Sequence, residues 1–108
     1  MKKSDIIISV ELDENHIPEQ ISWAAKDGGV DHQVTKAFLF SSWDDEAKEA
    51  MRIDLWTKKM TVDEMNMFFH QTLASLAVTY ERATSEIEVA QRIREFAEDF
   101  AIASGIRD

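Results

Sequence analysis

The spacing of apolar residues changes once along this chain, near residue 60, and that change limits the fold more than any other feature. Before residue 60, apolar and polar residues alternate, which is the two-residue period of a β-strand with one buried face. After it, apolar residues recur every three or four positions, which is the period of an amphipathic helix. Strands followed by helices predict an α+β fold rather than an alternating α/β fold.

Two strands are expected in the first quarter of the chain. In residues 5–12, Ile8 and Val10 alternate with polar neighbours, and Ile21 and Trp23 resume the alternation after a turn over residues 13–18. The segment 26–29 ends in two glycines, which supply the positive φ values of a tight turn. These patterns predict a hairpin of two strands.

Two further runs complete the strand-forming half. Residues 36–43 form a short apolar run that fits a buried strand or a short helix, and we favour the strand. Residues 51–58 alternate throughout and form the clearest strand. The acidic residues 44–46 between them lack the spacing and the glycine of a calcium loop, so a solvated loop is the preferred interpretation, with cation binding left open.

Two helices are expected in the second half. Thr61 and Glu64 have the spacing of a capping box, so a helix begins at Thr61. Ser85 and Glu88 repeat that spacing before a second helix over about 86–104, and Gly105 can then adopt a left-handed cap.

A chain of 108 residues has room for one core, so we predict a single α+β domain over 1–108. Its antiparallel sheet has about four strands within 5–58, and two C-terminal helices within 61–104 pack on one face of that sheet. The predicted core is formed by Ile8, Val10, Trp23, Ile53 and Leu55, packed against Phe69, Leu73 and Leu76.

Charge and composition exclude several functions. The chain has 21 acidic and 12 basic residues, and a net charge of −9 repels the nucleic-acid backbone. It has no cysteine, which excludes disulfides and thiolate chemistry. We find neither a signal peptide nor a membrane span, so we expect a cytoplasmic protein.

No catalytic, cofactor or metal site is predicted. The histidines at positions 16, 32 and 70 have no second ligand at metal-binding spacing, and no nucleophile is paired with a base. An enzyme or small-ligand protein would need a pocket that gathers His70 with Asp54 or Arg52. We therefore expect a protein that is not an enzyme and binds no cofactor.

A surface for protein contact is the remaining hypothesis. Arg52, Asp54 and Trp56 share one face of the strand 51–58, and Met67 and Phe68 lie away from the main apolar stripe of the first helix. These residue types are enriched at interfaces, but a polar sheet face and packing against the second helix would use the same residues. A second copy of the chain also stays open as the partner.

Several stretches together resemble the gliding-motility GldC family of Bacteroidota-type bacteria. They include Arg52-Ile-Asp-Leu-Trp-Thr-Lys58, Phe68-Phe-His-Gln-Thr72, Ser42-Trp-Asp44 and Asp27-Gly-Gly29, and the resemblance runs from about residue 5 to about residue 84. It implies a small cytoplasmic accessory protein of the gliding machinery, linked to type IX secretion, without known catalytic or ligand residues.

Two other functions stay open beside this one. A small acidic protein similar to secretion chaperones would present an apolar face to a client segment. A small-ligand protein or enzyme is the third alternative.

Overall fold

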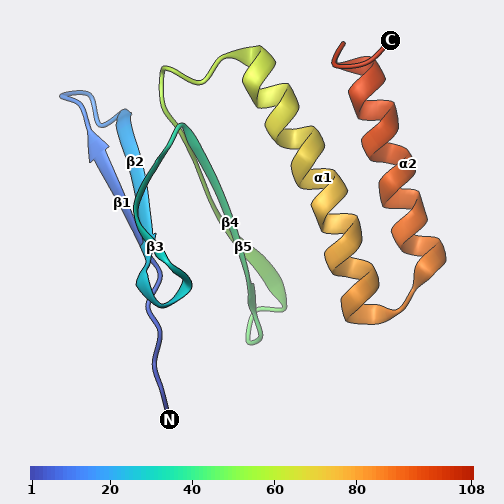
Figure 1. The fold of residues 1–108 in the computed structure, drawn as a ribbon, viewed down its shortest axis with the longest axis horizontal. Helices are drawn as coiled ribbons and strands as arrows, with labels where there is room; N and C mark the ends of the chain where they lie inside the picture. The colour runs from blue at the N-terminus through green and yellow to red at the C-terminus, as the bar shows by residue number, and fades with distance from the viewer. The chain divides into compact units, whose positions relative to one another are not determined.

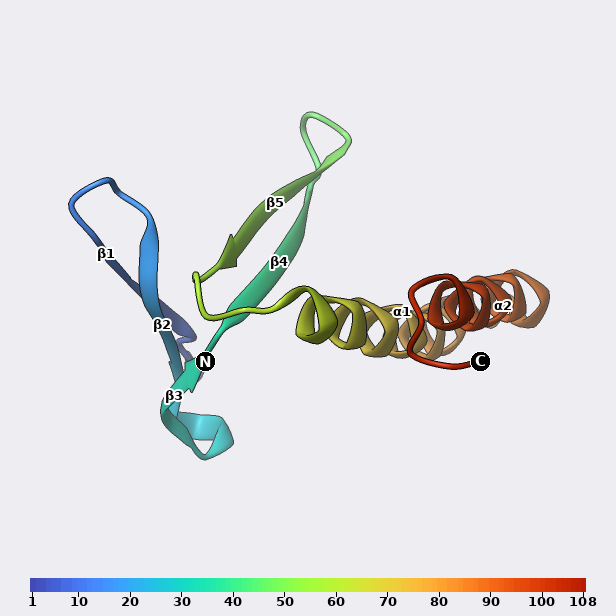
Figure 2. The same ribbon diagram turned by 90° about the horizontal axis from the view of Figure 1, so that it is seen from above.

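The computed structural model describes all 108 residues, and the chain divides into two compact units, residues 1–60 and residues 61–108. Five strands form the first unit and two helices form the second (Figures 1 and 2). The elements are β1 (Ile7–Leu12), β2 (Pro18–Ala25), a 3-10 turn (Lys26–Gly28), β3 (Val30–Thr35), β4 (Ala37–Asp44), β5 (Glu49–Trp56), α1 (Val62–Thr84) and α2 (Ile87–Ala103). This order confirms the α+β class, while the prediction of a single domain stays a prediction.

The first three strands form an antiparallel sheet in the order β1-β2-β3. Ile21 in the central strand lies opposite Val10 of β1 and Thr35 of β3, and it is fully buried. The predicted hairpin of the first two strands is therefore confirmed, with Ile21 at the centre of its covered face.

The strand β3 is absent from the prediction of about four strands. Its polar residues Asp31, His32 and Gln33 interrupt any apolar alternation, so the sequence pattern gives no strand signal there. Gly29 has a φ of 82°, and the tight turn that it closes returns the chain alongside β2. Pairing with β2, rather than local propensity, makes this segment a strand.

The remaining two strands form a separate sheet in which β4 and β5 pair over their whole length without a bulge. The strand interpretation of residues 36–43 is confirmed. Because side chains of directly opposite residues share a face, the register places Phe38, Phe40, Met51, Ile53 and Leu55 on one face, and Ala37, Leu39, Trp43, Arg52, Asp54 and Trp56 on the other. This two-stranded ribbon therefore carries large apolar side chains on both faces.

The predicted core is wrong in part. Ile53 and Leu76 are 52% and 53% exposed, and Phe69 is also exposed. The other predicted core residues, Ile8, Val10, Trp23, Leu55 and Leu73, are half-buried. Alternation identifies which side chains share a face, but a face is buried only where a second layer covers it.

Small side chains form the contact between the two helices. Ala77 of α1 and Ala90, Ala97 and Ala101 of α2 are buried, which allows the helix backbones to approach closely. The ring of Phe69 stacks on that of Phe100, with a centroid distance of 6.4 Å. Glu81 near the end of α1 accepts a hydrogen bond from Arg94 at 2.8 Å, so the helices run antiparallel.

The joint between the helices differs from the predicted one. Ser85 does not cap α2; it ends α1 with a left-handed φ of 60°, and its backbone N–H donates to the carbonyl of Glu81. The N-cap of α2 is Glu86, which makes no side-chain capping bond. The predicted second capping box is wrong because a two-residue joint needs Ser85 for the turn. Gly105 has the predicted left-handed conformation.

The predicted capping box of α1 is confirmed, and its contribution can be measured. The Thr61 hydroxyl accepts from the Glu64 backbone N–H at 3.1 Å, and the Glu64 carboxylate accepts from the Thr61 N–H at 3.0 Å. We expect Thr61→Ala to lower the free energy of unfolding by about 0.5–2 kcal/mol, because one backbone donor loses its acceptor. Denaturant titration measures this, and Thr61→Ser, which keeps the hydroxyl, should stay close to wild type. Equal losses in both variants would show that the hydroxyl is not the stabilising group.

Candidate functional site

The predicted contact residues of β5 lie together on one face of the two-stranded sheet. The Arg52 guanidinium binds the Asp54 carboxylate through two hydrogen bonds, at 2.8 Å and 3.3 Å. Both side chains remain about half exposed, at 48% and 41%. Trp56 is 56% exposed beside them, because the residue opposite it, Ala37, is small. This set, here called the Trp56 face, is a surface and not a closed pocket.

A second tryptophan on the Trp56 face was missed from the sequence. Trp43 of β4 lies on this face opposite the small residue Ala50, and its side chain is exposed. The face on which Trp43 lies can be assigned only from the pairing of β4 with β5. The turn after Asp44 fixes that pairing. The alternation of residues 51–58 alone gives no information about it.

An apolar hollow of about 340 Å³ lies at the end of the Trp56 face. Leu55 and Trp56 line it from β5, and the β1–β2 turn contributes its other wall. The complete lining is Leu12, His16, Ile17, Pro18, Asp54, Leu55 and Trp56. Most of these side chains are hydrocarbon or aromatic, so the hollow suits an apolar side chain of a partner rather than a charged ligand.

Asp13 positions the turn that forms this wall. One oxygen of its carboxylate accepts from the backbone N–H groups of Asn15 and Ile17, at 2.8 Å and 3.0 Å. The other accepts from the Lys58 ammonium at 2.8 Å. The Asp13 side chain is only 12% exposed, whereas that of Lys58 is 62% exposed. One carboxylate thus joins the β1–β2 turn to the segment that follows β5.

These hydrogen bonds shift the pKa values of both Asp13 and Lys58. The hydrogen bond from Lys58 and those from the backbone lower the pKa of Asp13. The hydrogen bond to Asp13 and its negative charge raise the pKa of Lys58. Each group therefore favours its charged form in the folded chain.

The second half of the predicted surface lies in the helical unit. Met67 is exposed and lines a shallow hollow of about 250 Å³ with Asn66 and Ile106. Phe68 is half-buried, and its ring makes an edge contact with Phe69 at 6.4 Å between centroids. The ring stacking and the ion pair between the helices come from Phe69 and Glu81 instead. The two halves of the predicted surface belong to different units, and the prediction that they join into one surface stays a prediction.

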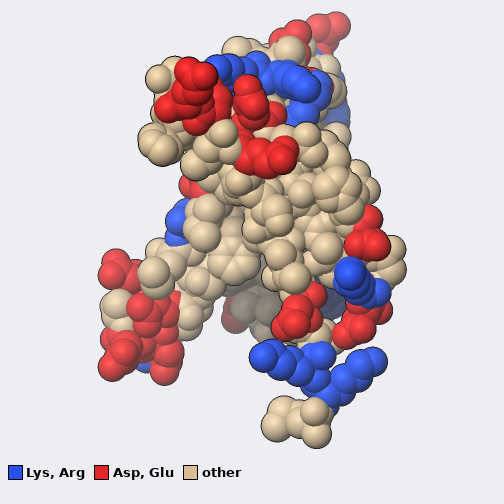
Figure 3. Space-filling view, turned by 90° about the vertical axis from the view of Figure 1, so that its left-hand side faces the viewer, with Lys and Arg blue, Asp and Glu red and all other residues tan.

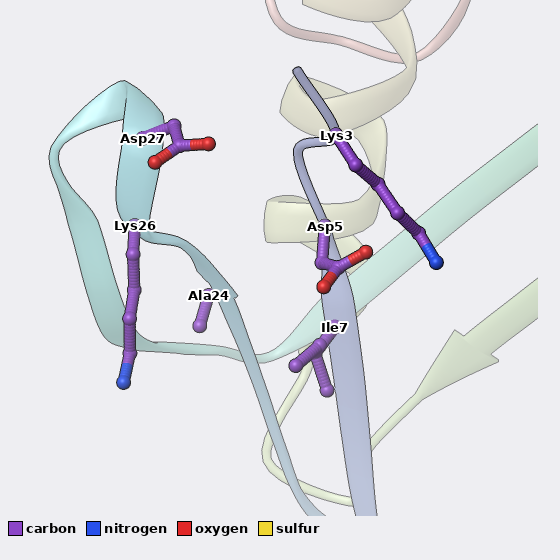
Figure 4. A pocket seen from close by; sticks show the side chains of 6 residues that line it. All are labelled: Lys3, Asp5, Ile7, Ala24, Lys26 and Asp27. Carbon is purple, nitrogen blue, oxygen red and sulfur yellow. The ribbon is translucent and has the colours of Figure 1, made fainter. Parts of the chain in front are cut away.

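A third hollow lies at the start of the chain and mixes charges of both signs. It is lined by Lys3, Asp5, Ile7, Ala24, Lys26 and Asp27 (Figure 4). The ammonium groups of the two lysines point away from each other in Figure 4, and Asp27 already accepts a hydrogen bond from Ser4 at 2.6 Å. These groups do not converge on one point, so the hollow offers no arrangement for binding an anion.

Charged side chains also gather at the turn between β4 and β5. In Figure 3 this turn is the acidic projection at the lower left, while lysines mark the start of the chain. Asp44 accepts from the backbone N–H of Glu46, and Asp45 pairs with Lys48 at 2.8 Å. The structure groups no three histidine, aspartate or glutamate side chains in a way that could hold a metal ion. Neither helix is both long enough and apolar enough to cross a membrane.

The Asp13–Lys58 pair predicts how stability changes with pH. Because the folded pKa of Asp13 is lowered, its contribution is present above the unfolded value of 3.8 and is lost as the pH falls through the folded value. We expect Asp13→Asn to be less stable than wild type at pH 7, with a difference that shrinks as the pH falls below 3.8. Urea unfolding at pH 7, 5 and 3 measures it. A difference that stays constant across these three values would exclude the charge of Asp13 as its cause.

Comparison with known proteins identifies a family. A family model described as "Gliding motility-associated protein GldC-like" matches residues 18–105. A search of curated proteins gives no match. A search of solved structures gives none either.

The matched segment extends from the first residue of β2 to just beyond the end of α2, so it includes β2 and β3 of the first sheet, the whole β4–β5 sheet and the whole helical hairpin. It also covers the second helix, which the resemblance noted from the sequence does not reach. The match spans most of the chain and contains the Trp56 face together with Met67 and Phe68. The chain therefore belongs to the GldC-like family of gliding motility-associated proteins.

Proposed function

We propose that this chain is a non-catalytic accessory protein of the bacterial gliding motility machinery, acting in the cytoplasm through contacts with other proteins. Membership of the GldC-like family supports the process. The exposed Trp56 face supports the mode of action, because it presents two tryptophans around a hydrogen-bonded Arg–Asp pair. Tryptophan and arginine are the residues most enriched among those that dominate the binding energy of interfaces.

The geometry of this face favours an anchor for a protein partner over a site for a small molecule. Its polar groups, Arg52 and Asp54, already satisfy each other and lie at the surface. The hollow beside Trp56 is open and mainly apolar. A partner that places an apolar side chain in this hollow would cover Trp56, and such central aromatic residues carry a large share of interface energy.

Substitution of Trp56 tests the proposal. We expect Trp56→Ala to weaken binding to the partner by roughly 2 kcal/mol or more, because it removes a central aromatic contact. The free energy of unfolding should change little, since Trp56 is largely exposed. Affinity capture from a gliding bacterium that carries the tagged chain identifies the partner, and titration with the purified partner gives the affinity.

Val34→Ala is the matched control, because Val34 is an exposed apolar residue of the first unit on the other sheet. It should leave binding unchanged. A partner from outside the motility and secretion machinery would contradict the assigned process. If Trp56→Ala unfolds the chain while the folded remainder still binds, Trp56 belongs to the core and the contact lies elsewhere.

A second candidate function is that of a secretion-chaperone-like protein, and the helical hairpin favours it. Phe69 and Leu76 lie seven residues apart on one side of α1, as Val89 and Phe96 do on α2, and all four are exposed. Phe69 stacks on Phe100, one turn from Phe96, so the two rows lie next to each other. A wide apolar face of this kind suits an unfolded client segment.

Client binding can be separated from the adaptor function. A chaperone should suppress the light scattering of a chemically unfolded model protein on dilution, and Phe96→Ser should weaken that effect several-fold because it breaks up the apolar face. Trp56→Ala should have no effect in this assay. If neither the wild type nor the variant reduces the scattering, the chaperone candidate is eliminated.

A further inference from the structure

The strand β5 has a free edge whose hydrogen-bonding groups can be assigned. It pairs with β4 and with no other strand. Directly beyond the ladder, the Thr57 N–H donates to the Lys36 carbonyl at 2.9 Å. Since Ala37 lies opposite Trp56, Thr57 and Lys36 are also directly opposite, which makes them a hydrogen-bonded pair.

Hydrogen-bonded and non-hydrogen-bonded pairs alternate along an antiparallel ladder. Counting back from Thr57, the backbone groups of Met51, Ile53 and Leu55 therefore point toward β4. Those of the alternate residues, Ala50, Arg52, Asp54 and Trp56, point away from it. The unpaired edge of β5 thus presents the backbone N–H and C=O groups of the residues of the Trp56 face.

We propose that two copies of this chain form a symmetric dimer by antiparallel pairing of β5 with β5, with the two-fold axis at Ile53. This inference rests on the edge and the charges of β5, and it does not depend on the proposed function. The dimer joins the two ribbons into a four-stranded sheet in the order β4-β5-β5-β4.

The charges of β5 select this register among those that the backbone allows. Only residues whose backbone groups face the edge can be paired by hydrogen bonds, so the register can shift only in steps of two residues. With the axis at Ile53, Arg52 lies opposite Asp54 of the second copy, and this favourable pair occurs twice. A shift in one direction places Arg52 opposite Arg52, and a shift in the other places Asp54 opposite Asp54, both of which are unfavourable.

Packing on both faces agrees with the same register. On the first face, Ile53 meets Ile53 of the second copy at the axis, and Met51 meets Leu55. On the Trp56 face, Trp56 lies opposite the small Ala50 of the second copy, just as Trp43 lies opposite Ala50 within the chain. Large side chains thus alternate with small ones across the sheet. The exposed charge pairs set the register, while the stabilisation comes from burial of these apolar side chains.

The other outer strands lack this complementarity. β1, β3 and β4 each contain one acidic residue and no lysine or arginine, whereas β5 contains Arg52 between Glu49 and Asp54. Self-pairing of the other three gives no attraction between opposite charges. In the β5 dimer the two acidic β4–β5 turns point in opposite directions. The most acidic parts of two chains of charge −9 are therefore kept apart, which weakens the repulsion between the chains.

Cysteine cross-linking tests the register directly, because the chain has no cysteine of its own. In the proposed dimer, Ile53 and its copy form a non-hydrogen-bonded pair with Cα atoms about 4.5 Å apart, within the range of a disulfide. Ile53→Cys should therefore give a disulfide-linked dimer under mild oxidation. Met51→Cys is the matched control, since Met51 shares the strand and face and is 57% exposed against 52% for Ile53. The two copies of residue 51 would lie about 13 Å apart, so this variant should not cross-link.

Charge reversal tests the pairing by a second route, using sedimentation equilibrium of the full chain over a range of concentrations. Wild type should show twice the chain mass of 12.4 kDa. Arg52→Asp and Asp54→Arg should each weaken the homodimer about tenfold or more, because two attractive pairs become repulsive. A mixture of these two variants should dimerise again. Positions 52 and 54 are both aspartate in one variant and both arginine in the other, so every pair between the two chains is attractive.

The mixture distinguishes pairing between chains from the Arg52–Asp54 contact within one chain. Both variants lose the contact within the chain, and mixing them restores only the attraction between chains. Circular dichroism shows whether each variant is folded. A monomeric wild type, or equal cross-linking at positions 51 and 53, overturns the proposal. A dimer that ignores both charge reversals also overturns it, because its interface then lies elsewhere.

Discussion

This chain has more large apolar side chains than buried positions for them, and this shortage leaves several of its surfaces apolar. Ile21 is the only large side chain that is completely buried, and the other buried apolar residues are alanines. Small residues in the interior hold α1 and α2 close together. The tryptophans of the β4–β5 ribbon and two phenylalanines of the helical hairpin, Phe69 and Phe96, lie at the surface. Burying one large side chain stabilises a fold by about 1.5–3 kcal/mol, so such surfaces are suited to association.

The sequence predicts those parts of the fold that depend on neighbouring residues. Thr61 and Glu64 form their capping box within four residues, and the alternation in β5 correctly separates Arg52 and Asp54 from Ile53. The strand β3 could not be predicted in this way, because its polar residues extend only through pairing with β2. As a residue type, Ser85 is suited both to end α1 and to cap the start of α2. Only the geometry of the joint between the helices decides between these two roles.

The candidate site can also be predicted only in part from neighbouring residues. The grouping of Arg52, Asp54 and Trp56 follows from strand alternation alone, whereas Trp43 joins them only through a register fixed by the turn. The ion pair between Asp13 and Lys58 connects residues 45 positions apart, and no local pattern indicates it. Yet this pair positions the wall of the hollow beside Trp56. Local periodicity thus identifies the face, while its boundaries depend on long-range contacts.

The acidic composition takes on a different meaning beside these apolar surfaces. Unpaired strand edges and exposed aromatic side chains are the usual starting points of aggregation. A charge of −9 keeps copies of the chain apart except where a specific contact outweighs the repulsion. This protection depends on ionised carboxylates, and it vanishes near the isoelectric point of about 4.7. The same carboxylates that repel the nucleic-acid backbone therefore serve as colloidal stabilisers, and acidification toward that point removes the barrier to precipitation.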